Sequence, residues 1–295
     1  MTRRNRFLAF AILFAVSVVF WWRPIIRTVS LAQANDAYTH ILLVLPLSLA
    51  LIYLDRKDGR IDAQHGMPVA LGIIILVVAV LVACLARWSH AEILTNSALS
   101  ISMFALVLWW IGSVVLCFGA EVFRTFMFPL CFLFWIVPAP EFVLNPTVRF
   151  LQHQSAFGAR LLFHAIGVPA TQDGVMLSIP NLDIEVATEC SSIRSSMMLI
   201  LITMVLAQLF LRSRWRKTLL IAAAIPLSVA KNALRIVTIA VLGTRVDPGY
   251  LHGNLHRQGG IIFLGIAVAA EALLLWILQR TERRGVRNAS PMAPA

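Results

Sequence analysis

Apolar runs long enough to cross a lipid bilayer recur along the chain, and they constrain its fold more than any other feature of the sequence. A transmembrane helix needs about 20 predominantly apolar residues. Runs close to this length cover residues 7–22, 40–54, 67–87, 97–118, 122–137, 190–211, 218–242 and 259–278. Because 59% of the 295 residues are hydrophobic and 13% are charged, the chain lacks the polar surface of a soluble domain. We therefore predict an all-α integral membrane protein with about eight transmembrane helices.

Basic residues gather at the ends of these runs and predict the orientation. The clusters are Arg3, Arg4 and Arg6; Arg56, Lys57 and Arg60; Arg212, Arg214, Arg216 and Lys217; and Arg280, Arg283, Arg284 and Arg287. With eight helices they fall on one side, so the positive-inside rule predicts a bacterial inner-membrane protein with both termini in the cytoplasm. The net charge of +11 then reflects topology, and we expect a lipid bilayer, not nucleic acid, as the partner.

We expect residues 1–285 to form a single polytopic membrane domain and residues 286–295 a disordered cytoplasmic tail. The first run lacks a small-residue cleavage site after Trp21 and Trp22, so we interpret it as a retained helix, not a signal peptide. In this topology residues 138–189 form an insertion on the outer face. Within it, residues 145–166 predict a short interfacial helix, and apolar residues alternate on either side of Pro180-Asn181. This alternation predicts a β-hairpin before the sixth transmembrane helix.

One cysteine differs from the rest. Cys84, Cys117 and Cys131 lie within apolar runs, where we expect them to be buried packing residues. Cys190 instead lies in Thr188-Glu189-Cys190-Ser191-Ser192-Ile193-Arg194, at the predicted outer end of the sixth helix. The positive end of the helix dipole and Arg194 would both stabilise a thiolate there. The alternative is an ordinary helix start, capped by Thr188 or Ser191, with a cysteine that has no chemical role.

The seventh run carries polar residues that are rare inside a membrane. Asn232 and Arg235 are three residues apart and therefore share a helix face, and Lys231 precedes them. Such residues usually face a bundle interior or a water-filled cavity. Arg235 could alternatively extend its side chain to the outer interface. Lys231 lies one turn deeper, so this alternative explains its position less well. Glu271, in the eighth run, we expect to pair across the bundle, with Lys231 as its candidate partner.

Two histidines precede the eighth run. His252 and His256 are four residues apart, so on a continuous helix they could bind a metal together, but Gly253 and the lack of a nearby carboxylate disfavour a metal site. A histidine acting as acid or base beside Cys190 fits better, because its side chain titrates near neutral pH. His256 starts the helix and is the better placed of the two. The alternative is a loop histidine at the level of the lipid headgroups.

Together these motifs resemble the exosortase and archaeosortase family of multipass membrane cysteine transpeptidases. The matching residues are Glu189-Cys190-Ser191-Ser192-Ile193-Arg194, Asn232-Ala233-Leu234-Arg235-Ile236, and His256 with Gly259-Gly260. The early segment Asp36-Ala37-Tyr38-Thr39-His40, before Leu43-Val44-Leu45-Pro46, looks like the first outer loop and second helix of the family. Ser192 stands where glycine is commoner in the family, and Lys231 where a small residue is frequent. These departures suggest a subfamily.

The resemblance implies Cys190, Arg235 and His256 as catalytic residues, with Arg194, Asn232, Glu189, Ser191 and His252 supporting them or binding substrate. Cys190 would form a thioester with a peptide carbonyl at the periplasmic face, His256 would act as acid and base, and Arg235 would stabilise negative charge. The implied substrates are secreted proteins with a sorting signal of the PEP-CTERM type, which consists of a short C-terminal motif, one transmembrane helix and a basic tail. No cofactor or metal is required.

Two other functions remain open from the sequence. A transporter or export component for exopolysaccharide could line its pathway with Lys231, Arg235 and Glu271, and would depend little on the Cys190 thiol. An intramembrane protease would share the acyl-enzyme but transfer the acyl group to water. The sequence does not distinguish water from an amine as the second nucleophile.

Overall fold

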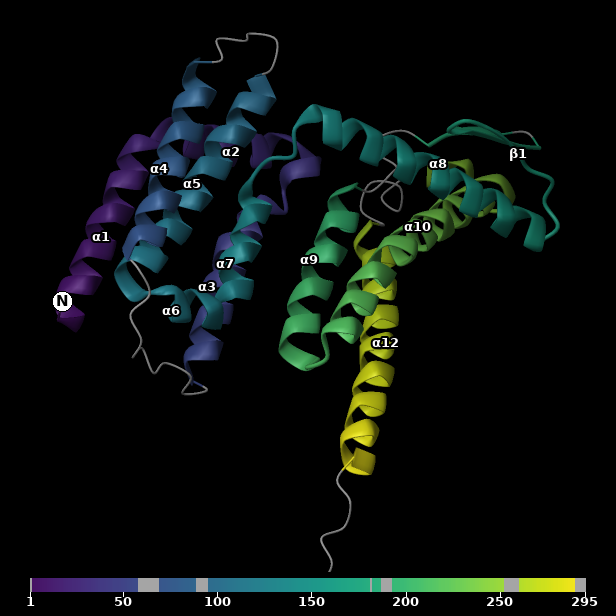
Figure 1. The fold of residues 1–295 in the computed structure, drawn as a ribbon. Helices are drawn as coiled ribbons and strands as arrows, with labels where there is room; N and C mark the ends of the chain where they lie inside the picture. The colour runs from purple at the N-terminus through teal and green to yellow at the C-terminus, as the bar shows by residue number, and fades with distance from the viewer. Residues whose placement is uncertain are drawn as a thin grey trace, which may run out of the picture. The chain divides into compact units, whose positions relative to one another are not determined.

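The computed structural model describes residues 2–57, 69–88, 95–180, 182–186, 193–251 and 260–289 (Figure 1). It confirms the prediction of an all-α membrane protein, because the described chain is almost entirely helical apart from one small sheet. The chain divides into two compact units, Met1–Leu144 and Asn145–Ala295. Each unit is described by itself below.

The first unit consists of helices. They are α1 (Arg3–Phe20), α2 (Trp22–Ala34), η1 (Asp36–Tyr38), α3 (Ile41–Lys57), α4 (Val69–Trp88), α5 (Thr95–Phe118), α6 (Ala120–Thr125), α7 (Met127–Phe132) and η3 (Leu133–Ile136). Helices α4 and α5 pack side by side, and a Cβ atom added to Gly72 would lie 2.7 Å from Leu116 Cα. A small residue allows this close approach. Helix α1 is joined to α5 by the Trp109 indole, which donates a hydrogen bond to Leu13 O at 3.0 Å.

The fifth predicted span, residues 122–137, is not one continuous helix, so this prediction was wrong in detail. Gly119, with φ of 91°, ends α5, and the chain then forms α6, α7 and η3. Pro129 has no N–H to donate to the carbonyl of Thr125, and its ring would clash with that carbonyl, so an unbroken helix is disfavoured there. The break falls at Phe126, between α6 and α7.

Among the described residues, six helices are long and apolar enough to cross a membrane singly. Two bent helix pairs would raise the number to eight if each pair is one span. One pair is α1 with α2, bent by 69°, and the other is Met127–Ile136 with α8 (Glu141–Ala165). The expectation of about eight spans agrees with this upper number. Of the three cysteines expected to be buried, only Cys117 is buried; Cys84 on α4 and Cys131 on α7 are exposed.

The second unit contains most of α8, a sheet and three long helices. Its elements after α8 are β1 (Thr171–Asp173), β2 (Met176–Ile179), β3 (Leu182–Glu185), α9 (Ile193–Phe210), α10 (Arg214–Arg245), η4 (Pro248–Leu251) and α12 (Gly260–Ala289). The predicted hairpin is confirmed: β2 and β3 are antiparallel, and Ile179 pairs with Leu182 across the turn. Strand β1 was not predicted, although Asp173-Gly174 is a typical hairpin turn and Gly174 has φ of 59°.

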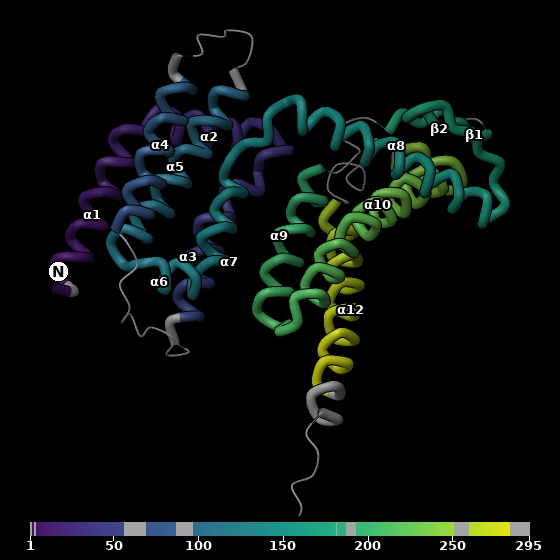
Figure 2. Tube along the Cα trace, viewed as in Figure 1, coloured from purple at the N-terminus to yellow at the C-terminus, as the bar shows by residue number. Residues whose placement is uncertain are grey.

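Two cores stabilise this unit. The first lies between α8, the sheet and the second half of α10, and it includes the fully buried Phe163 and Leu177. The second lies between α9, α10 and α12 (Figure 2) and has two apolar layers. One layer contains Leu199, Ala224 and Ala267; the other contains Ala207, Leu211, Leu220, Leu275 and Leu278. Helix α10 takes part in both cores and therefore determines how the sheet and the bundle are arranged in this unit.

Candidate functional site

The predicted site residues divide into two groups. Glu189, Cys190, Ser191, His252 and His256 lie outside the described residues. Arg194, Asn232 and Arg235 are described: Arg194 is exposed at the start of α9, Asn232 is buried in α10, and Arg235 is partly buried one turn further along α10. The structure therefore describes the arginine motif on α10 and the elements that precede and follow the cysteine motif in the sequence.

The chain that leads to the cysteine motif is fixed by α8 and the sheet. Gln152 Nε2 on α8 donates a hydrogen bond to Val186 O at 2.8 Å, and both residues are buried. The Val186 amide donates to Val175 O at 3.0 Å. Since Val186 precedes Cys190 by four residues, the cysteine motif leaves the sheet from a fixed point. This role of Gln152 was not predicted; its only signal is a polar residue among the buried positions of α8.

The chain that leaves the cysteine motif enters α9, whose first turn is hydrogen-bonded to α10. Lys231 Nζ donates to Ser195 Oγ, and Ser228 Oγ donates to Ser196 Oγ. Ser195 and Ser196 follow Cys190 by five and six residues. The fold therefore brings the helix of the cysteine motif against the helix of the arginine motif, as the prediction of a common site requires.

The two α10 residues of this contact share one helix face with Asn232 and Arg235. Ser228, Lys231, Asn232 and Arg235 follow one another at spacings of three, one and three residues, which places them on one side of a helix. Ser228, Lys231 and Asn232 are buried. The sequence prediction missed Ser228; Ser195 and Ser196 belong to the polar run that begins at Thr188, but their contacts with α10 were not predicted. The spacing of three residues between Ser228 and Lys231, which places both on one helix face, is the signal that could have predicted Ser228.

The opposite face of α10 is apolar and fixes the rotation of the helix. Ala233, Ile236, Val237 and Ala240 pack in the core formed with α8 and the sheet. At the closest approach, a Cβ atom added to Gly158 on α8 would lie 3.0 Å from the Ala233 Cβ. Rotation of α10 would place its polar face in this tightly packed core, so the direction of Lys231 toward α9 is strongly determined.

The expected pair between Glu271 and Lys231 does not form. Lys231 instead bonds to Ser195, near the start of α9. Glu271 lies on α12 between Ala267 and Leu275, which belong to the two apolar layers of the bundle. Its side chain is 1% exposed, and neither carboxylate oxygen has a hydrogen-bond partner among the described residues. The prediction was wrong because sequence alone did not place the two residues at different heights in the bundle.

The described residues contain no group of three or more His, Cys, Asp or Glu side chains that could hold a metal ion. The polar face of α10 instead offers hydroxyl, amide and cationic groups. Such groups can orient a peptide or stabilise a developing negative charge. This is the chemistry expected of a site for acyl transfer.

Comparison with known families identifies the chain. The model for transmembrane exosortases matches residues 21–276. The chain belongs to the transmembrane exosortase family. This exosortase match includes the positions of all three predicted motifs, and it confirms the resemblance seen in the sequence. No curated protein and no solved structure matches the chain.

Exosortases are membrane cysteine transpeptidases that process sorting signals. The chain is accordingly a multi-pass membrane protein of this family, in agreement with its long apolar helices. Within the exosortase match, the contact between α9 and α10 joins the segment that follows the cysteine motif to the segment that contains the arginine motif.

Proposed function

We propose that this exosortase cleaves the C-terminal sorting signal of secreted, membrane-anchored proteins through a thioester on Cys190. The observation that carries the proposal is the hydrogen bond from Lys231 on α10 to Ser195 on α9, which joins the arginine-motif helix to the helix that follows Cys190. This bond supports the proposal because it joins the helix that contains Arg235 to the helix that begins three residues after Cys190 in the sequence.

The proposed reaction has two steps. In the first, Cys190 Sγ attacks the carbonyl carbon of the scissile peptide bond, the C–N bond breaks, and His256 gives a proton to the leaving amine. The amino-terminal part of the substrate remains as a thioester. In the second, water or an amine attacks the thioester while His256 accepts a proton from this nucleophile, and the C–S bond breaks to release the Cys190 thiolate. Arg235 stabilises the oxyanion that forms in both steps.

Lys231 supports this chemistry as a second, more deeply buried cation. It is 5% exposed and precedes Arg235 by four residues, so both cations lie on the face of α10 directed toward α9. Two cations on one buried face favour the binding of a negative group, such as a thiolate or an oxyanion. Asn232, buried between them, can orient a peptide group.

The proposed location is the periplasmic face of the bacterial inner membrane, with both termini in the cytoplasm. The four basic clusters at helix ends support this orientation through the positive-inside rule. A substrate with a single transmembrane helix could reach the enzyme by lateral diffusion and present the peptide bond just outside the membrane. Its basic tail would remain in the cytoplasm.

A transporter is less well supported. Lys231 bonds to Ser195, and Glu271 lies between two layers of apolar residues in the α9, α10 and α12 bundle. The three residues Lys231, Arg235 and Glu271 therefore do not form a continuous polar pathway in the described bundle.

The proposal is tested by co-expressing the protein with a secreted candidate substrate that ends in a motif, a helix and a basic tail. The size and C-terminal mass of the substrate are measured in membranes containing wild type, Cys190→Ala or Cys131→Ala. Cys131 is the matched control, because it is an exposed cysteine on α7, in the other unit. We expect Cys190→Ala, Arg235→Ala and His256→Ala to abolish processing and Cys131→Ala to leave it unchanged. Normal processing by Cys190→Ala would refute the thioester mechanism, and the terminal mass identifies the acceptor.

A further inference from the structure

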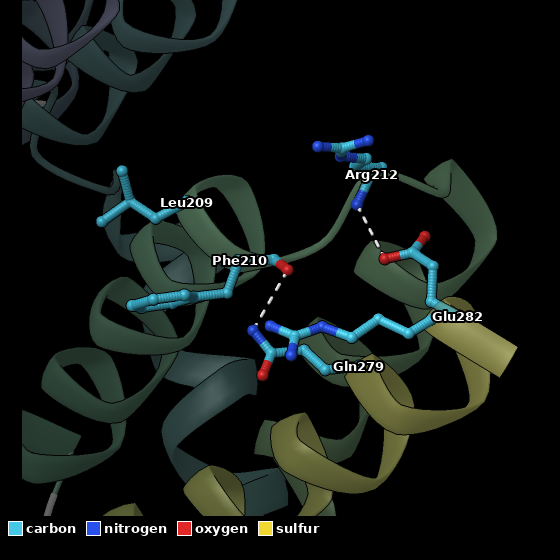
Figure 3. A pocket seen from close by; sticks show the side chains of 6 residues that line it. Leu209, Phe210, Arg212, Gln279 and Glu282 are labelled. Atoms are coloured by element: carbon cyan, nitrogen blue, oxygen red, sulfur yellow. Dashed lines mark hydrogen bonds between the residues drawn. The ribbon is translucent and has the colours of Figure 1, made fainter. Parts of the chain in front are cut away.

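A second site lies at the end of the α9, α10 and α12 bundle, where α9 turns into α10. A cavity of about 430 Å³ is lined there by Leu209, Phe210, Arg212, Gln279, Glu282 and Arg283 (Figure 3). This volume is within the range of about 300–1,000 Å³ that is typical of small-molecule sites. The cavity lies where α9 ends and α10 begins, whereas Ser195 lies in the first turn of α9 and Lys231 near the middle of α10, so the cavity is separate from the proposed catalytic site.

The walls of the cavity are held by α12. Glu282 accepts a hydrogen bond from the backbone amide of Arg212 at 3.2 Å, and Gln279 Nε2 donates to Phe210 O at 3.2 Å (Figure 3). Glu282 also accepts a hydrogen bond from the backbone amide of Ser213 at 2.7 Å. Glu282 also forms an ion pair with Arg216 at 3.4 Å. These bonds fix the turn between α9 and α10 against α12, so the cavity has a defined shape.

The same bonds leave the cavity positively charged. The carboxylate of Glu282 is occupied by two amides and Arg216. Within the described part of the chain, neither Arg212 nor Arg283 has a carboxylate within 4.0 Å of its guanidinium group, and both side chains are exposed. Arginine binds phosphate strongly because its planar guanidinium group can donate two parallel hydrogen bonds. The cavity therefore favours an anion, and it disfavours a basic peptide.

Apolar and aromatic residues surround this charge. Leu209 and Phe210 are exposed at the edge of the cavity. Trp215 is exposed in the first turn of α10, and Trp276 is exposed on α12, where the Arg280 guanidinium lies 3.7 Å from its ring centroid. Tryptophan and arginine are typical of the boundary between lipid chains and headgroups. A ligand here would meet cations and an apolar surface together.

We propose that this cavity binds the phosphate group of an anionic phospholipid, with Arg212 and Arg283 holding the phosphate and Leu209 and Phe210 contacting an acyl chain. The expected topology places this end of the bundle in the cytoplasmic leaflet, where anionic lipids attract basic segments. A lipid bound here would bridge α9, α10 and α12 at their shared end.

The test measures lipid binding to the purified full-length protein in detergent by native mass spectrometry, with phosphatidylglycerol and phosphatidylcholine as probes. We expect phosphatidylglycerol to bind at least ten-fold more tightly. Arg212→Gln and Arg283→Gln should each weaken its binding about five-fold, as expected for loss of one basic residue near a phosphate. The matched control is Arg245→Gln, an exposed arginine at the other end of α10, which should change binding less than two-fold. Equal binding of the two lipids, or unchanged phosphatidylglycerol binding when Arg212→Gln and Arg283→Gln are combined, would overturn the proposal.

Free phosphate is distinguished by competition. Inorganic phosphate and glycerol phosphate are added at millimolar concentration before the lipid. If either displaces phosphatidylglycerol completely, the site binds a soluble phosphate and the lipid assignment is wrong. A basic peptide that binds in place of the lipid would also contradict it. The thermal unfolding midpoint of each arginine variant is compared with that of wild type in phosphatidylcholine. If one variant is less stable than wild type, the binding measured for the other arginine variant decides the test.

Discussion

The ammonium group of Lys231 on α10 donates a hydrogen bond to the hydroxyl of Ser195 on α9; Lys231 is buried and Ser195 is partly buried. A lysine in this position has lost most of its hydration. Its hydrogen bond to Ser195 therefore contributes more to the free energy of unfolding than the same bond would at the surface. Ser228 and Ser196 form a parallel contact one turn away. The two bonds fix the first turn of α9, which continues from the cysteine motif.

Ser195→Ala is expected to destabilise the protein, because it leaves a buried ammonium group without its acceptor. The expected loss is about 1.5–3 kcal/mol of unfolding free energy, the range for hydrogen bonds to charged groups. Adding Lys231→Met to Ser195→Ala should cost less than the sum of the single variants, since the two residues are coupled. Thermal unfolding in detergent measures this cycle, with the exposed Thr218→Ala as control. If the destabilisations caused by Ser195→Ala and Lys231→Met were additive, the hydrogen bond between the two residues would contribute nothing to stability.

Lys231→Met is also expected to slow alkylation of Cys190 by a maleimide at neutral pH. A charge within about 15 Å contributes ~1 kcal/mol at an effective dielectric constant of about 20, which corresponds to about five-fold in thiolate population. The experiment uses a background in which Cys84, Cys117 and Cys131 are replaced by Ala. Lys231→Arg keeps the charge and should retain most of the rate. An unchanged rate in Lys231→Met would limit Lys231 to a structural role.

Gln152→Leu is expected to loosen the segment that leads to the cysteine motif. The substitution keeps α8 helical but leaves the buried Val186 carbonyl without the amide that donates to it at 2.8 Å. An unsatisfied buried acceptor costs about 1–3 kcal/mol. Processing of a co-expressed substrate should fall, and hydrogen exchange of residues 175–186 should become faster. His153→Leu, an exposed neighbour on α8, serves as control, and equal effects of the two variants would contradict this role.

The elements of the second unit were largely predictable from the sequence, and their side-chain contacts were not. Alternating apolar residues around Pro180-Asn181 predicted β2 and β3 because strand periodicity is local. The family motifs likewise predicted that α9 and α10 meet. The pairing of Lys231 with Ser195 depends on the rotation and height of two helices, which Gly158 and Ala233 determine through a contact between distant parts of the sequence. Apolar periodicity does not encode such contacts.

The break at Phe126 shows the same limit in the first unit. Residues 122–137 are apolar throughout, so composition favoured a single span. The positive φ of Gly119 and the missing N–H of Pro129 interrupt that helix instead. Pro46, Pro146 and Pro226 lie inside helices that continue past them, so proline alone did not predict which run would break.

Glu282→Ala is expected to destabilise the protein far more than removal of an exposed acid. Glu282 accepts two backbone hydrogen bonds at the start of α10, where the Ser213 side chain forms no capping bond. Loss of a helix cap costs about 0.5–2 kcal/mol. Glu121→Ala is the control, because its ion pair with Arg124 is exposed and such pairs contribute about 0–1 kcal/mol. Thermal unfolding midpoints compare the two, and equal shifts would show that Glu282 does not cap α10.

Glu271→Leu is expected to stabilise the protein. The carboxyl group of Glu271 is buried between the apolar layers of the α9, α10 and α12 bundle, and both oxygens lack hydrogen-bond partners among the described residues. Thr203, between Leu199 and Ala207 on α9, also has a buried hydroxyl without a partner there. Burial of a polar group without a hydrogen bond costs about 1–3 kcal/mol on the scale of protein mutations.

The matched variant Thr203→Val replaces the hydroxyl by a methyl group of similar size and should also raise the unfolding midpoint. Glu271→Gln should raise the unfolding midpoint less than Glu271→Leu, because the amide remains polar and buried. Thermal unfolding in detergent ranks the three variants, and substrate processing is measured in parallel. A stable Glu271→Leu variant that processes substrate normally agrees with surface chemistry at the far end of α9. Loss of substrate processing with intact folding would instead assign Glu271 a role in the bundle interior. That result would support the transporter hypothesis, in which Glu271 lines a polar pathway.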